Sequence, residues 1–400
     1  MNSVKFFRNN GTAARRLRVL HIANWYPSEA NPVEGIFIKQ HIQLLNEEAE
    51  GEVVHLSVGK GQHFLTKREI AISDWERSIE VKTSIKLFDI VRDLIVTLLL
   101  LGVLLKRQSK FDVVNVHIAY PLLSFYFIWK HYIRKPIVIT EHWSANHLHF
   151  GLPPDKRWKL RRIRRIFRQR LPVIAVSNAL SEDIARFAGS CAPTFQRHVV
   201  PNALDTDTFV WHSEPRRNGP ARLFIVNYWK DIKNPFPMLE AFSSLVAAGE
   251  DLILTLGGYG PLMPKLHVFI EERSLHSSIR LSGQMTAQDI AAVLAESDAY
   301  LITSNYETFS VACAQALCCG VPLIGPPIPA IREYACDLDM VAVAGNTPHG
   351  WHEAFVAFLA RRESFDRKAI SERAHSRFSR DLTRGAYLSA LLEAAEGCAS

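Results

Sequence analysis

The pattern that most constrains this chain is a regular alternation of short apolar runs with helix-forming segments, which occurs twice. The first half contains the runs RVLHIANW, EVVHLSVG, FDVVNVHIAY, KPIVITEHW and LPVIAVSNA. The second half contains ARLFIVNYW, DLILTLGGYG, SIRLSGQM, AYLITSNY and VPLIGP. Strands that alternate with helices form a parallel sheet covered by helices on both faces. The pattern therefore predicts an α/β protein with two Rossmann-like, doubly wound domains.

The length of the chain and the linker between its halves set the expected domain boundaries. Four hundred residues are more than one hydrophobic core usually serves. The polar segment PNALDTDTFVWHSEPRRNGPAR separates the two sets of runs. We expect a first domain over 1–205, a second over 206–380, and a C-terminal helix over 381–400 that packs back on the first domain. Because such sheets bind ligands at the carboxyl ends of their strands, the domains are expected to face each other across a cleft.

Charge is divided unevenly along the chain. Residues 1–200 hold 30 Lys and Arg against 17 Asp and Glu, whereas residues 201–400 hold 17 against 23. The two halves are therefore expected to meet different partners. The amino-terminal segment has no apolar core before the first strand, which argues against a secretory signal. Without C-x-x-C spacing, the cysteines are expected to be free thiols in a reducing, cytoplasmic setting: Cys191, Cys313, Cys318, Cys319, Cys336 and Cys398.

The segment ETFSVACAQALCCGVPLIG joins a strand to a helix of small residues. The exposed N–H groups and positive dipole end of such a helix suit a phosphate. Glu307, just before the helix, can accept hydrogen bonds from ligand hydroxyls, and the Gln315 side chain leans back toward the same place. The alternative is a Glu that caps the helix and a Gln bonded within the core. The residues expected to form the phosphate seat are Thr308, Phe309, Ser310 and Val311.

Two further strand ends of the second half carry candidate donor-binding residues. The run GGYGP places Gly257 and Tyr259 at the end of a strand, where glycine allows close approach of a ligand. It does not fit the G-x-G-x-x-G dinucleotide motif, and a plain turn is the alternative. Lys230 and Lys233 follow another strand and can reach a phosphate as cations, with solvated surface lysines as the alternative.

The first half offers candidates at the same ends of its strands. Gly35, a candidate donor-binding residue, lies at a strand-to-helix junction that is expected to face the same cleft. His142 follows the strand IVIT, also on the side of the cleft. His117 occupies a similar place with less support. The acidic pair Asp205 and Asp207 lies in the linker rather than beside a strand end, so we predict no metal site there.

Taken together, these motifs resemble glycosyltransferase family 4, whose members are retaining enzymes with the two-domain GT-B fold. The resemblance runs from about Val19 to about Asp381, nearly the whole chain. Its pieces, in order, are GIFIKQH, FDVVNVH, ITEHWS, IAVSNAL, VVPNALDTDTF, KDIKNP, LTLGGYGP, IRLSGQM and SNYETFSVACAQALCCGVPLIG. Each piece alone is weakly specific, whereas nine in the right order and spacing are strongly specific. In this family the PNALDTDTF segment is the interdomain connection.

The resemblance implies roles for the candidate residues of the second half. Glu307 matches the glutamate that contacts the donor sugar, and Lys233 matches the lysine that holds the diphosphate. Two positions depart from the family pattern. Gln315 stands where the family has a glutamate on the nucleotide ribose, a change that weakens binding by ~1–2 kcal/mol. Tyr228 stands at the position of the diphosphate-binding arginine, for which Lys230 can substitute only as a point charge.

The implied reaction needs neither metal nor cofactor. Lys233 and the amides at the start of the helix stabilise the leaving nucleoside diphosphate, and His142 lies near the reacting sugar. We identify no nucleophile on the donor face, so we favour displacement on one face of the sugar. In that mechanism a diphosphate oxygen helps to deprotonate the acceptor hydroxyl, and domain closure excludes water.

Residues 156–170, KRWKLRRIRRIFRQR, form a basic amphipathic helix with nine Lys and Arg. It suits an anionic membrane surface, with a solvated helix and a nucleic-acid site as alternatives, and we expect no nucleic-acid partner. The run LIVTLLLLGVLL is too short to cross a bilayer and is either a core helix or a segment on the membrane. The residues assigned to this membrane and acceptor face are Arg161, Arg162, Arg164, Arg165 and Arg168.

The sequence thus predicts a metal-independent hexosyltransferase in cell-surface polysaccharide or glycolipid synthesis. Its expected partners are a UDP- or GDP-sugar donor and a saccharide or lipid-linked acceptor, at the inner face of the cell membrane. Two alternatives stay open. One is a catalytically silent GT-B protein that binds a membrane or partner, which Tyr228 and Gln315 permit. The other is a nucleotide-sugar epimerase, which needs acid and base carboxylates that we do not identify.

Overall fold

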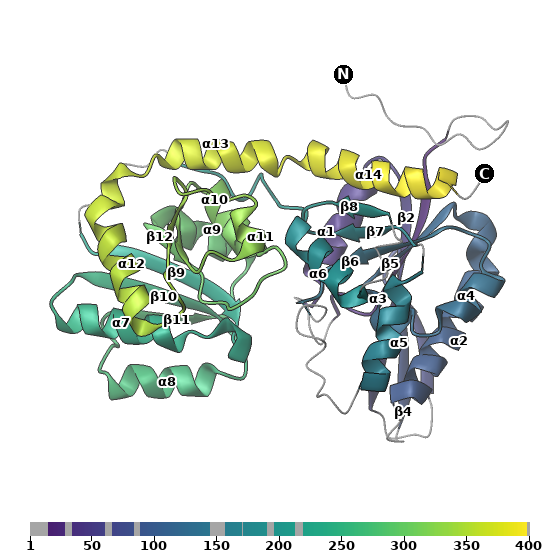
Figure 1. Cartoon of the computed structure of the whole chain (residues 1–400), viewed down its shortest axis with the longest axis horizontal. Coiled ribbons are helices and arrows are strands. Elements are labelled where there is room, and N and C mark those ends of the chain that lie inside the picture. Colours follow the sequence, from purple (N-terminus) through teal and green to yellow (C-terminus); the bar gives the residue numbers. More distant parts are fainter. Residues whose placement is uncertain are drawn as a thin grey trace. The chain divides into compact units, whose positions relative to one another are not determined.

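The computed structural model divides the chain into two compact units. Unit 1 comprises Met1–Ala203 and Asp381–Ser400, and unit 2 comprises Leu204–Arg380. Each unit is described by itself, and Figure 1 labels the elements of both. The residues that the structure describes are 15–28, 34–60, 66–83, 89–144, 157–169, 171–189, 196–212 and 219–397.

The described strands of unit 1 form one sheet in the order β3-β4-β2-β1-β5-β6-β7-β8. All neighbours are parallel except β3 and β4, which form an antiparallel pair at one edge. The antiparallel strand β3 was not predicted, because its residues are polar and exposed and carry no apolar run. The strands are β1 Arg18–Ala23, β2 Glu50–Lys60, β3 Thr66–Ala71, β4 Glu76–Thr83, β5 Val113–His117, β6 Ile137–Glu141, β7 Val173–Ala175 and β8 Arg197–Val199.

Helices cover the sheet of unit 1, and one of them comes from the far end of the chain (Figure 1). The side chains of Tyr387, Leu388 and Leu391 of the last helix are buried among residues of the central strands, such as Val19 and Val113. Arg384 of the same helix pairs with Glu47 and Glu48. The helices are α1 Ile36–Leu45, α2 Asp89–Arg107, α3 Ala119–Leu122, α4 Tyr126–Tyr132, α5 Arg157–Phe167, α6 Asn178–Ala188 and α14 Arg380–Gly397.

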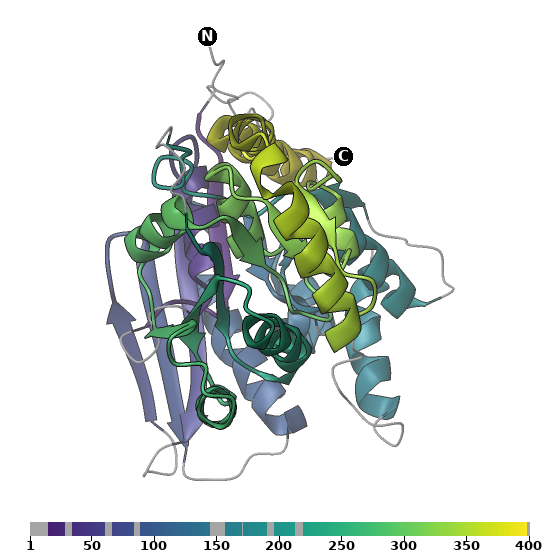
Figure 2. The same cartoon turned by 90° about the vertical axis from the view of Figure 1, so that its left-hand side faces the viewer.

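The described strands of unit 2 form a wholly parallel sheet in the order β11-β10-β9-β12-β13-β14. Helices lie on both faces of it, with α7 and α8 on one side and α9, α10 and α11 on the other (Figures 1 and 2). The strands are β9 Ala221–Tyr228, β10 Leu252–Tyr259, β11 Ile279–Gly283, β12 Ala299–Leu301, β13 Leu323–Gly325 and β14 Met340–Ala342. The helices are α7 Phe236–Ala247, α8 Met263–Glu272, α9 Ala287–Glu296, α10 Val311–Cys318, α11 Pro329–Arg332, α12 Pro348–Arg361 and α13 Arg367–Arg377.

Strand order locates the place in each sheet where a ligand site is expected. The chain of unit 2 builds outward from β9 in one direction and then returns to add β12 on the other side of β9. Unit 1 does the same around β1, with β5 on the other side. Doubly wound sheets bind ligands at such switch points, outside the carboxyl ends of the strands. The prediction of two parallel α/β domains is therefore confirmed. In each sheet the topology points to one ligand position, at the carboxyl ends of β9 and β12 in unit 2 and of β1 and β5 in unit 1.

Local sequence signals account for several helix starts. The Thr286 hydroxyl accepts a hydrogen bond from the Asp289 N–H while the Asp289 carboxylate accepts one from the Thr286 N–H, a reciprocal capping box for α9. Thr347 and Asp366 cap α12 and α13 with their side chains. Helix α10 differs from these neighbours, because its N-cap residue Ser310 makes no side-chain cap.

The apolar run LIVTLLLLGVLL lies within α2, whose side chains alternate between the interior and solvent. Among the described residues, no helix combines the length and the apolar character that crossing a bilayer requires. The prediction of free thiols is confirmed for Cys313 and Cys318 in α10 and for Cys319 at its C-cap, which are all buried and free. Cys336 is free and exposed, whereas Cys191 and Cys398 lie outside the described residues.

Candidate functional site

The switch point of unit 2 brings together the two residues that the sequence placed on the donor. Lys233 closes a short turn after β9, and Glu307 follows β12, the strand next to β9. Lys233 Nζ lies 2.6 Å from Glu307 Oε1, and the same oxygen accepts a hydrogen bond from Ser304 Oγ at 2.6 Å. The two side chains keep 17% and 16% of their surface exposed. The structure thus holds a compact, solvent-reached ion pair at the strand ends.

The turn that begins α10 lies three residues beyond Glu307 and presents backbone N–H groups. Ser310 has φ of 66° and provides no side-chain cap, and the first turn of the helix contains no acidic residue. The Tyr334 hydroxyl donates to the carbonyl oxygens of Phe309 and Ser310, at 2.6 and 3.2 Å. These bonds fix the carbonyl groups and leave the first N–H groups without a side-chain acceptor. An uncapped, rigid helix start of this kind is a good anion seat.

The predicted residues Thr308 to Val311 differ in what they present. The Phe309 ring is buried against Tyr334 and Phe378, at ring-centroid distances of 5.4 and 5.6 Å. Its side chain therefore anchors the turn in the core, and only its backbone is available to a ligand. This packing does not fill the start of the helix, because Ser310 and Val311 remain half-buried.

The two positions that depart from the family pattern are both reached by solvent. Gln315 is half-buried and makes no side-chain hydrogen bond to any described residue, which contradicts the alternative of a Gln bonded in the core. Tyr228 is 50% exposed, and its ring lies 5.2 Å from that of Tyr259, edge to face. Lys230 is exposed and has no ion pair among the described residues. Tyr228 and Tyr259 end β9 and β10, and Lys230 follows β9 by two residues.

Gly257 serves the packing of unit 2. A Cβ built there would come within 2.5 Å of Met285 Sδ and 3.1 Å of Val226 Cγ2. Its carbonyl accepts a hydrogen bond from the buried Trp229 indole at 2.9 Å. The absence of a side chain is thus explained by neighbours within the unit, and the predicted contact of Gly257 with the donor stays a prediction.

The switch point of unit 1 contains a buried row of imidazoles. His21 Nδ1 lies 3.1 Å from His117 Nε2, and His117 Nδ1 lies 3.4 Å from His142 Nε2. His142 Nδ1 lies 3.2 Å from Asn202 Oδ1. With that amide oxygen as acceptor, each ring donates from Nδ1, and the Nε2 atoms of His117 and His142 accept. His21 Nε2 is buried and has no hydrogen-bond partner among the described residues. Each ring is then neutral, and the row ends at His142, the predicted catalytic residue.

Burial keeps these rings uncharged. Desolvation lowers the pKa of His21 to about 3 and that of His41 to about 4, the latter despite a hydrogen bond to the Pro201 carbonyl. The same cause holds the pKa of His117 and of His142 well below the usual value. The Tyr387 hydroxyl of α14 contacts the Asn115 amide beside the row. The C-terminal helix therefore completes this polar cluster as well as the apolar core.

Aromatic rings border His142 on the side of the strand ends. Phe37, in the first turn of α1, lies 4.8 Å from the His142 ring, and Trp143 lies 5.2 Å from Trp25, edge to face. All three aromatic rings are partly exposed. Gly35 permits this arrangement, because it adopts φ of 66° and a Cβ there would come within 2.6 Å of the Trp25 carbonyl carbon and oxygen. Sequence reasoning assigned no role to these rings, although Trp25 and Trp143 are the last residues of two of the runs quoted above.

Glu141 is a second residue that the sequence analysis missed. It ends β6 immediately before His142 and is buried. Burial raises the pKa of its carboxyl to about 7, although the N–H groups of Ala119, His142 and Trp143 all donate to it. The carboxylate therefore holds the loop that carries His142 and Trp143. A Glu at the end of a strand that begins with three apolar residues was the available signal.

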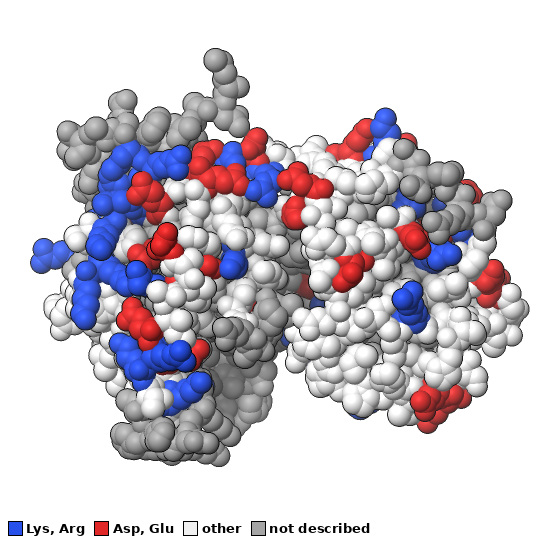
Figure 3. Space-filling model, turned by 180° about the vertical axis from the view of Figure 1, so that it is seen from behind, with Lys and Arg blue, Asp and Glu red and all other residues white. Residues whose placement is uncertain are grey.

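The basic helix α5 exposes only part of its charge. Arg161 and Arg165 are exposed, whereas the Arg164 guanidinium lies 5.1 Å from the centre of the Phe187 ring. Arg168 Nε donates to the Ala188 carbonyl at 2.8 Å. Two of the predicted surface arginines thus also pack against α6, and the side chain of Arg162 lies outside the described residues. On the face seen in Figure 3, Lys and Arg are more numerous over unit 1 than over unit 2.

The linker acids hold a turn. Asp205 accepts hydrogen bonds from the Asp207 and Thr208 N–H groups and from the Thr208 hydroxyl, the last at 2.6 Å. Within the ranges that the structure describes, no group of three or more His, Cys, Asp or Glu has the spacing to hold a metal ion. Asp205 thus has a structural role in the turn, to which Asp207 contributes its backbone N–H.

Two family models match consecutive parts of the chain. The model described as Glycosyltransferase Family 4 matches residues 65–208, and the model described as Glycosyl transferases group 1 matches residues 210–377. Among curated relatives, a GDP-mannose-dependent alpha-(1-6)-phosphatidylinositol dimannoside mannosyltransferase of Mycobacterium tuberculosis is 29% identical over 188 residues. The match covers 44% of this chain and 47% of that relative, so the chain spans about half the length of the curated protein it matches.

Solved structures extend the likeness over nearly the whole fold. Sucrose-phosphate synthase from Thermosynechococcus elongatus superposes with a TM-score of 0.71 at 14% identity, covering 92% of this chain and 96% of that one. The Anabaena protein Alr3699/HepE, solved with UDP and glucose, gives 0.68 at 14% identity, covering 92% and 98%. At this identity the likeness shows the fold. Together with the two family models, it shows that the chain belongs to glycosyltransferase family 4 and has the GT-B fold.

Proposed function

We propose that this protein is a retaining, metal-independent hexosyltransferase that moves a sugar from a nucleotide-sugar to a saccharide or lipid-linked acceptor. The observation that carries the proposal is the Lys233–Glu307 ion pair in front of the uncapped start of α10, at the switch point of unit 2. The cation and the helix amides suit a diphosphate, and the carboxylate suits sugar hydroxyls. The named relative uses GDP-mannose and HepE was solved with UDP, which supports a UDP- or GDP-sugar as donor.

In this proposal the ion pair opens when the donor binds. Lys233 Nζ moves from Glu307 to a diphosphate oxygen, and the freed carboxylate accepts hydrogen bonds from the sugar. The amides at Ser310 and Val311 hold the terminal phosphate. Negative charge that develops on the leaving diphosphate then meets Lys233 and the helix dipole, and no resident cation is needed.

Unit 1 supplies the acceptor side of the proposal. His142 is neutral and has aromatic neighbours, which suits an uncharged carbohydrate. Trp25, Phe37 and Trp143 offer partly exposed ring faces on which a pyranose can pack its C–H groups. Nε2 of His142 contacts His117 only at 3.4 Å, a long distance for a hydrogen bond, so in this proposal a substrate hydroxyl replaces His117 as the partner of that nitrogen.

We also propose that unit 1 docks on the inner face of the cell membrane, which places the protein in the cytoplasm as a peripheral membrane protein. The exposed cations Arg161 and Arg165 and the half-exposed Trp158 of α5 support this. Vesicle binding is then expected to weaken as salt rises. Binding that is indifferent to salt and to substitution of the basic residues would contradict this part of the proposal.

Calorimetry with a panel of UDP-, GDP- and ADP-sugars tests the donor site. Binding of one class of nucleotide-sugar that is lost in Lys233→Met supports the transferase. Detection of a glycosylated product then identifies the acceptor. The rival proposal is a catalytically silent protein, which the loss of an arginine at Tyr228 favours. Absence of binding to every nucleotide-sugar would support that rival.

A further inference from the structure

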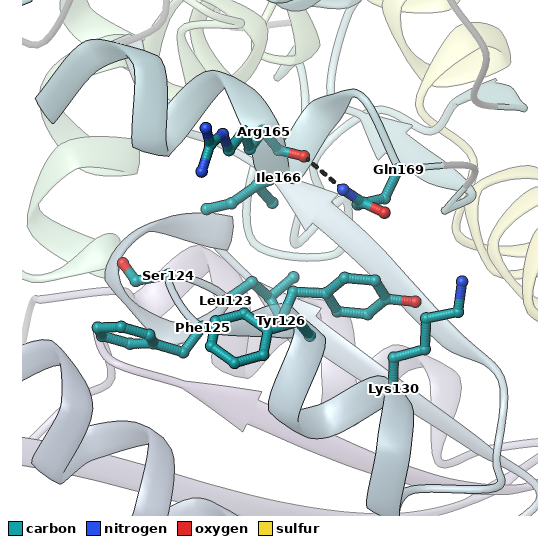
Figure 4. A pocket seen from close by; sticks show the side chains of 9 residues that line it. Leu123, Ser124, Phe125, Tyr126, Lys130, Arg165, Ile166 and Gln169 are labelled. Carbon is teal, nitrogen blue, oxygen red and sulfur yellow. Dashed lines mark hydrogen bonds between the residues drawn. The ribbon is translucent and has the colours of Figure 1, made fainter. Parts of the chain in front are cut away.

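A cavity separate from both switch points opens on unit 1 between α4 and α5. Its volume is about 510 Å³, within the range of small-molecule sites. Figure 4 shows Phe125 and Tyr126 on one wall and Ile166 and Gln169 on the other. The full lining is Leu123, Ser124, Phe125, Tyr126, Phe127, Lys130, Arg165, Ile166 and Gln169.

The walls of this cavity offer little to a sugar or a nucleotide. The Ser124 hydroxyl already donates to Asp93 at 3.0 Å, and the Gln169 amide donates to the Arg165 carbonyl at 3.1 Å (Figure 4). The other uncharged lining groups are aromatic or aliphatic, apart from the Tyr126 hydroxyl. A ligand rich in hydroxyl groups would leave most of them without partners, at a cost. The lining therefore favours a hydrocarbon ligand.

Two cations stand at the rim of the cavity. Lys130 and Arg165 are exposed, and neither pairs with a carboxylate of the described chain. In Figure 4, Lys130 lies at one end of the cavity beside the Tyr126 ring, and Arg165 lies on the α5 wall. An apolar interior with basic groups at its mouth complements an amphiphile that has an anionic head group.

The surface around the cavity suits a bilayer better than a soluble metabolite. Phe127, on α4 at the rim, is 68% exposed. Helix α2 packs against α4 and has apolar side chains turned to solvent along one side. Large apolar groups exposed together mark an interaction surface. These side chains of α2 are Ile90, Val91, Leu94, Leu98 and Leu105.

We infer that the α4–α5 cavity takes one hydrocarbon chain of an anionic bilayer lipid whose phosphate pairs with Lys130 or Arg165 at the rim. The inference rests on the membrane docking proposed above and makes it specific. Basic residues of α5 attract the vesicle surface by charge, and the cavity then holds a single lipid by its chain. The cavity is thus a lipid site distinct from the donor and acceptor positions.

Photolabelling of the full-length protein tests this inference. The protein is bound to vesicles of phosphatidylcholine that contain a phosphatidylglycerol with a diazirine in one acyl chain, illuminated and digested. Mass spectrometry then maps the labelled peptides. We expect the strongest labelling in the peptides that contain Phe125–Lys130 and Arg165–Gln169. Labelling confined to α2 and to the solvent side of α5 would overturn the inference and leave the cavity to a segment of another protein.

Two variants separate the contribution of the bound acyl chain from that of the basic residues at the rim. Gln169→Trp places an indole at the rim to fill the cavity and leaves every charge in place, so cavity labelling is expected to fall several-fold while vesicle pelleting persists. Gln288→Trp, on exposed α9 of unit 2, is the matched control and is expected to change neither. The double variant Lys130→Glu with Arg165→Glu is expected to abolish the preference for a phosphatidylglycerol probe over a phosphatidylcholine probe.

The results distinguish this inference from the proposal beneath it. If Gln169→Trp still binds vesicles and its cavity labelling is unchanged, the α4–α5 cavity is not the site of the acyl chain. The proposal of membrane docking would be unaffected. Equal labelling by the two probes in the unaltered protein would overturn the anionic head group. Failure of the protein to bind any anionic vesicle at low salt would remove both the docking and the lipid site, without bearing on the donor calorimetry.

Discussion

The two switch points of this protein share one topology and have opposite chemistry. In unit 2 the strand ends carry an ion pair, a second exposed lysine and an uncapped helix start. In unit 1 the corresponding place carries neutral imidazoles, amides and aromatic rings, together with the buried carboxyl of Glu141. The same fold therefore presents fixed charge in one unit and uncharged polar and aromatic groups in the other.

This difference supports the ligands that we propose for the two sites. A diphosphate carries charge that the lysine and helix dipole of unit 2 can balance. A carbohydrate carries no charge but has hydroxyl groups and C–H faces, which neutral imidazoles and indole rings match. The comparison teaches that the two sites differ through the few residues after each strand, because both sheets have the same kind of switch point.

The largest expected effect concerns the charge in unit 2. Lys233→Met removes the cation that meets the developing diphosphate charge, so kcat/KM for transfer should fall by about 10²–10³-fold. Steady-state kinetics with the donor identified by calorimetry measures the loss. Lys265→Met, on the exposed side of α8, is the control and should leave the rate unchanged. An equal loss in both variants would mean that general charge, rather than this site, matters.

The second prediction concerns the uncharged buried histidines of unit 1 and the effect of pH on the stability of that unit. Burial lowers the pKa of His21 to about 3 and of His41 to about 4, so between about pH 4 and 6.5 the unfolded chain binds protons that the folded chain does not. The free energy of unfolding of unit 1 should therefore fall as pH falls through this window. Each histidine contributes up to about 1.4 kcal/mol per pH unit. Glu141, with its pKa raised to about 7, acts with the opposite sign between about pH 4.5 and 7.

Urea unfolding read by pulsed hydrogen exchange measures the two units separately. Unit 1 should lose stability on acidification more steeply than unit 2. His21→Gln should reduce the slope of unit 1 by about 1.4 kcal/mol per pH unit, because one titrating group is removed. A slope that is flat, or equal in the two units, would show that the imidazole row is protonated in the folded protein.

The third prediction concerns the substitution Gln315→Glu, which adds a carboxylate to the proposed donor site of unit 2. Gln315 is half-buried and has no partner among the described side chains, so Gln315→Glu should fit without loss of a bond. A carboxylate can accept two hydrogen bonds from ribose hydroxyls, which should tighten donor binding by ~1–2 kcal/mol, or about tenfold. Titration calorimetry reads the change, and Gln288→Glu on exposed α9 serves as the control. Weaker binding in Gln315→Glu would place the ribose elsewhere.

The smallest expected effect concerns the rings of unit 1. Trp143→Ala removes one aromatic face beside His142 and should raise the acceptor KM several-fold, since such contacts contribute about 0.5–1.5 kcal/mol. The donor affinity should stay the same. Trp143→Phe should recover much of the loss, because a ring face is kept. A lower kcat with an unchanged acceptor KM would argue that Trp143 acts by holding the His142 loop instead.

The fold could be predicted because its signals are local. Each central strand is an apolar run that ends in a polar turn, and residues such as Lys233 and Glu307 follow those runs directly. Parallel strands bring their carboxyl ends to one edge, so the meeting of these two residues follows from topology. The hairpin of β3 and β4 was missed, since the exposed residues of β3 give no apolar pattern.

The remainder of the site could not be predicted because it depends on contacts between distant segments. His21 and His117 lie on adjacent strands but are separated by 96 positions in sequence, and nothing in either segment specifies their pairing. The sequence placed the backbone of Phe309 at the phosphate seat but gave no position for its ring, which packs against Phe378 in the core. Arg164 was placed on the surface by helical spacing, but an aromatic ring of α6 draws it inward.

The contribution of α14 to unit 1 has a consequence for how the chain is made. Tyr387 and Leu391 fill the core of a unit whose other residues all precede Leu204. During synthesis the ribosome releases the whole of unit 2 before it releases these side chains. We therefore expect unit 2 to reach its native state first, with unit 1 held open and in need of chaperone protection until α14 has left the ribosome.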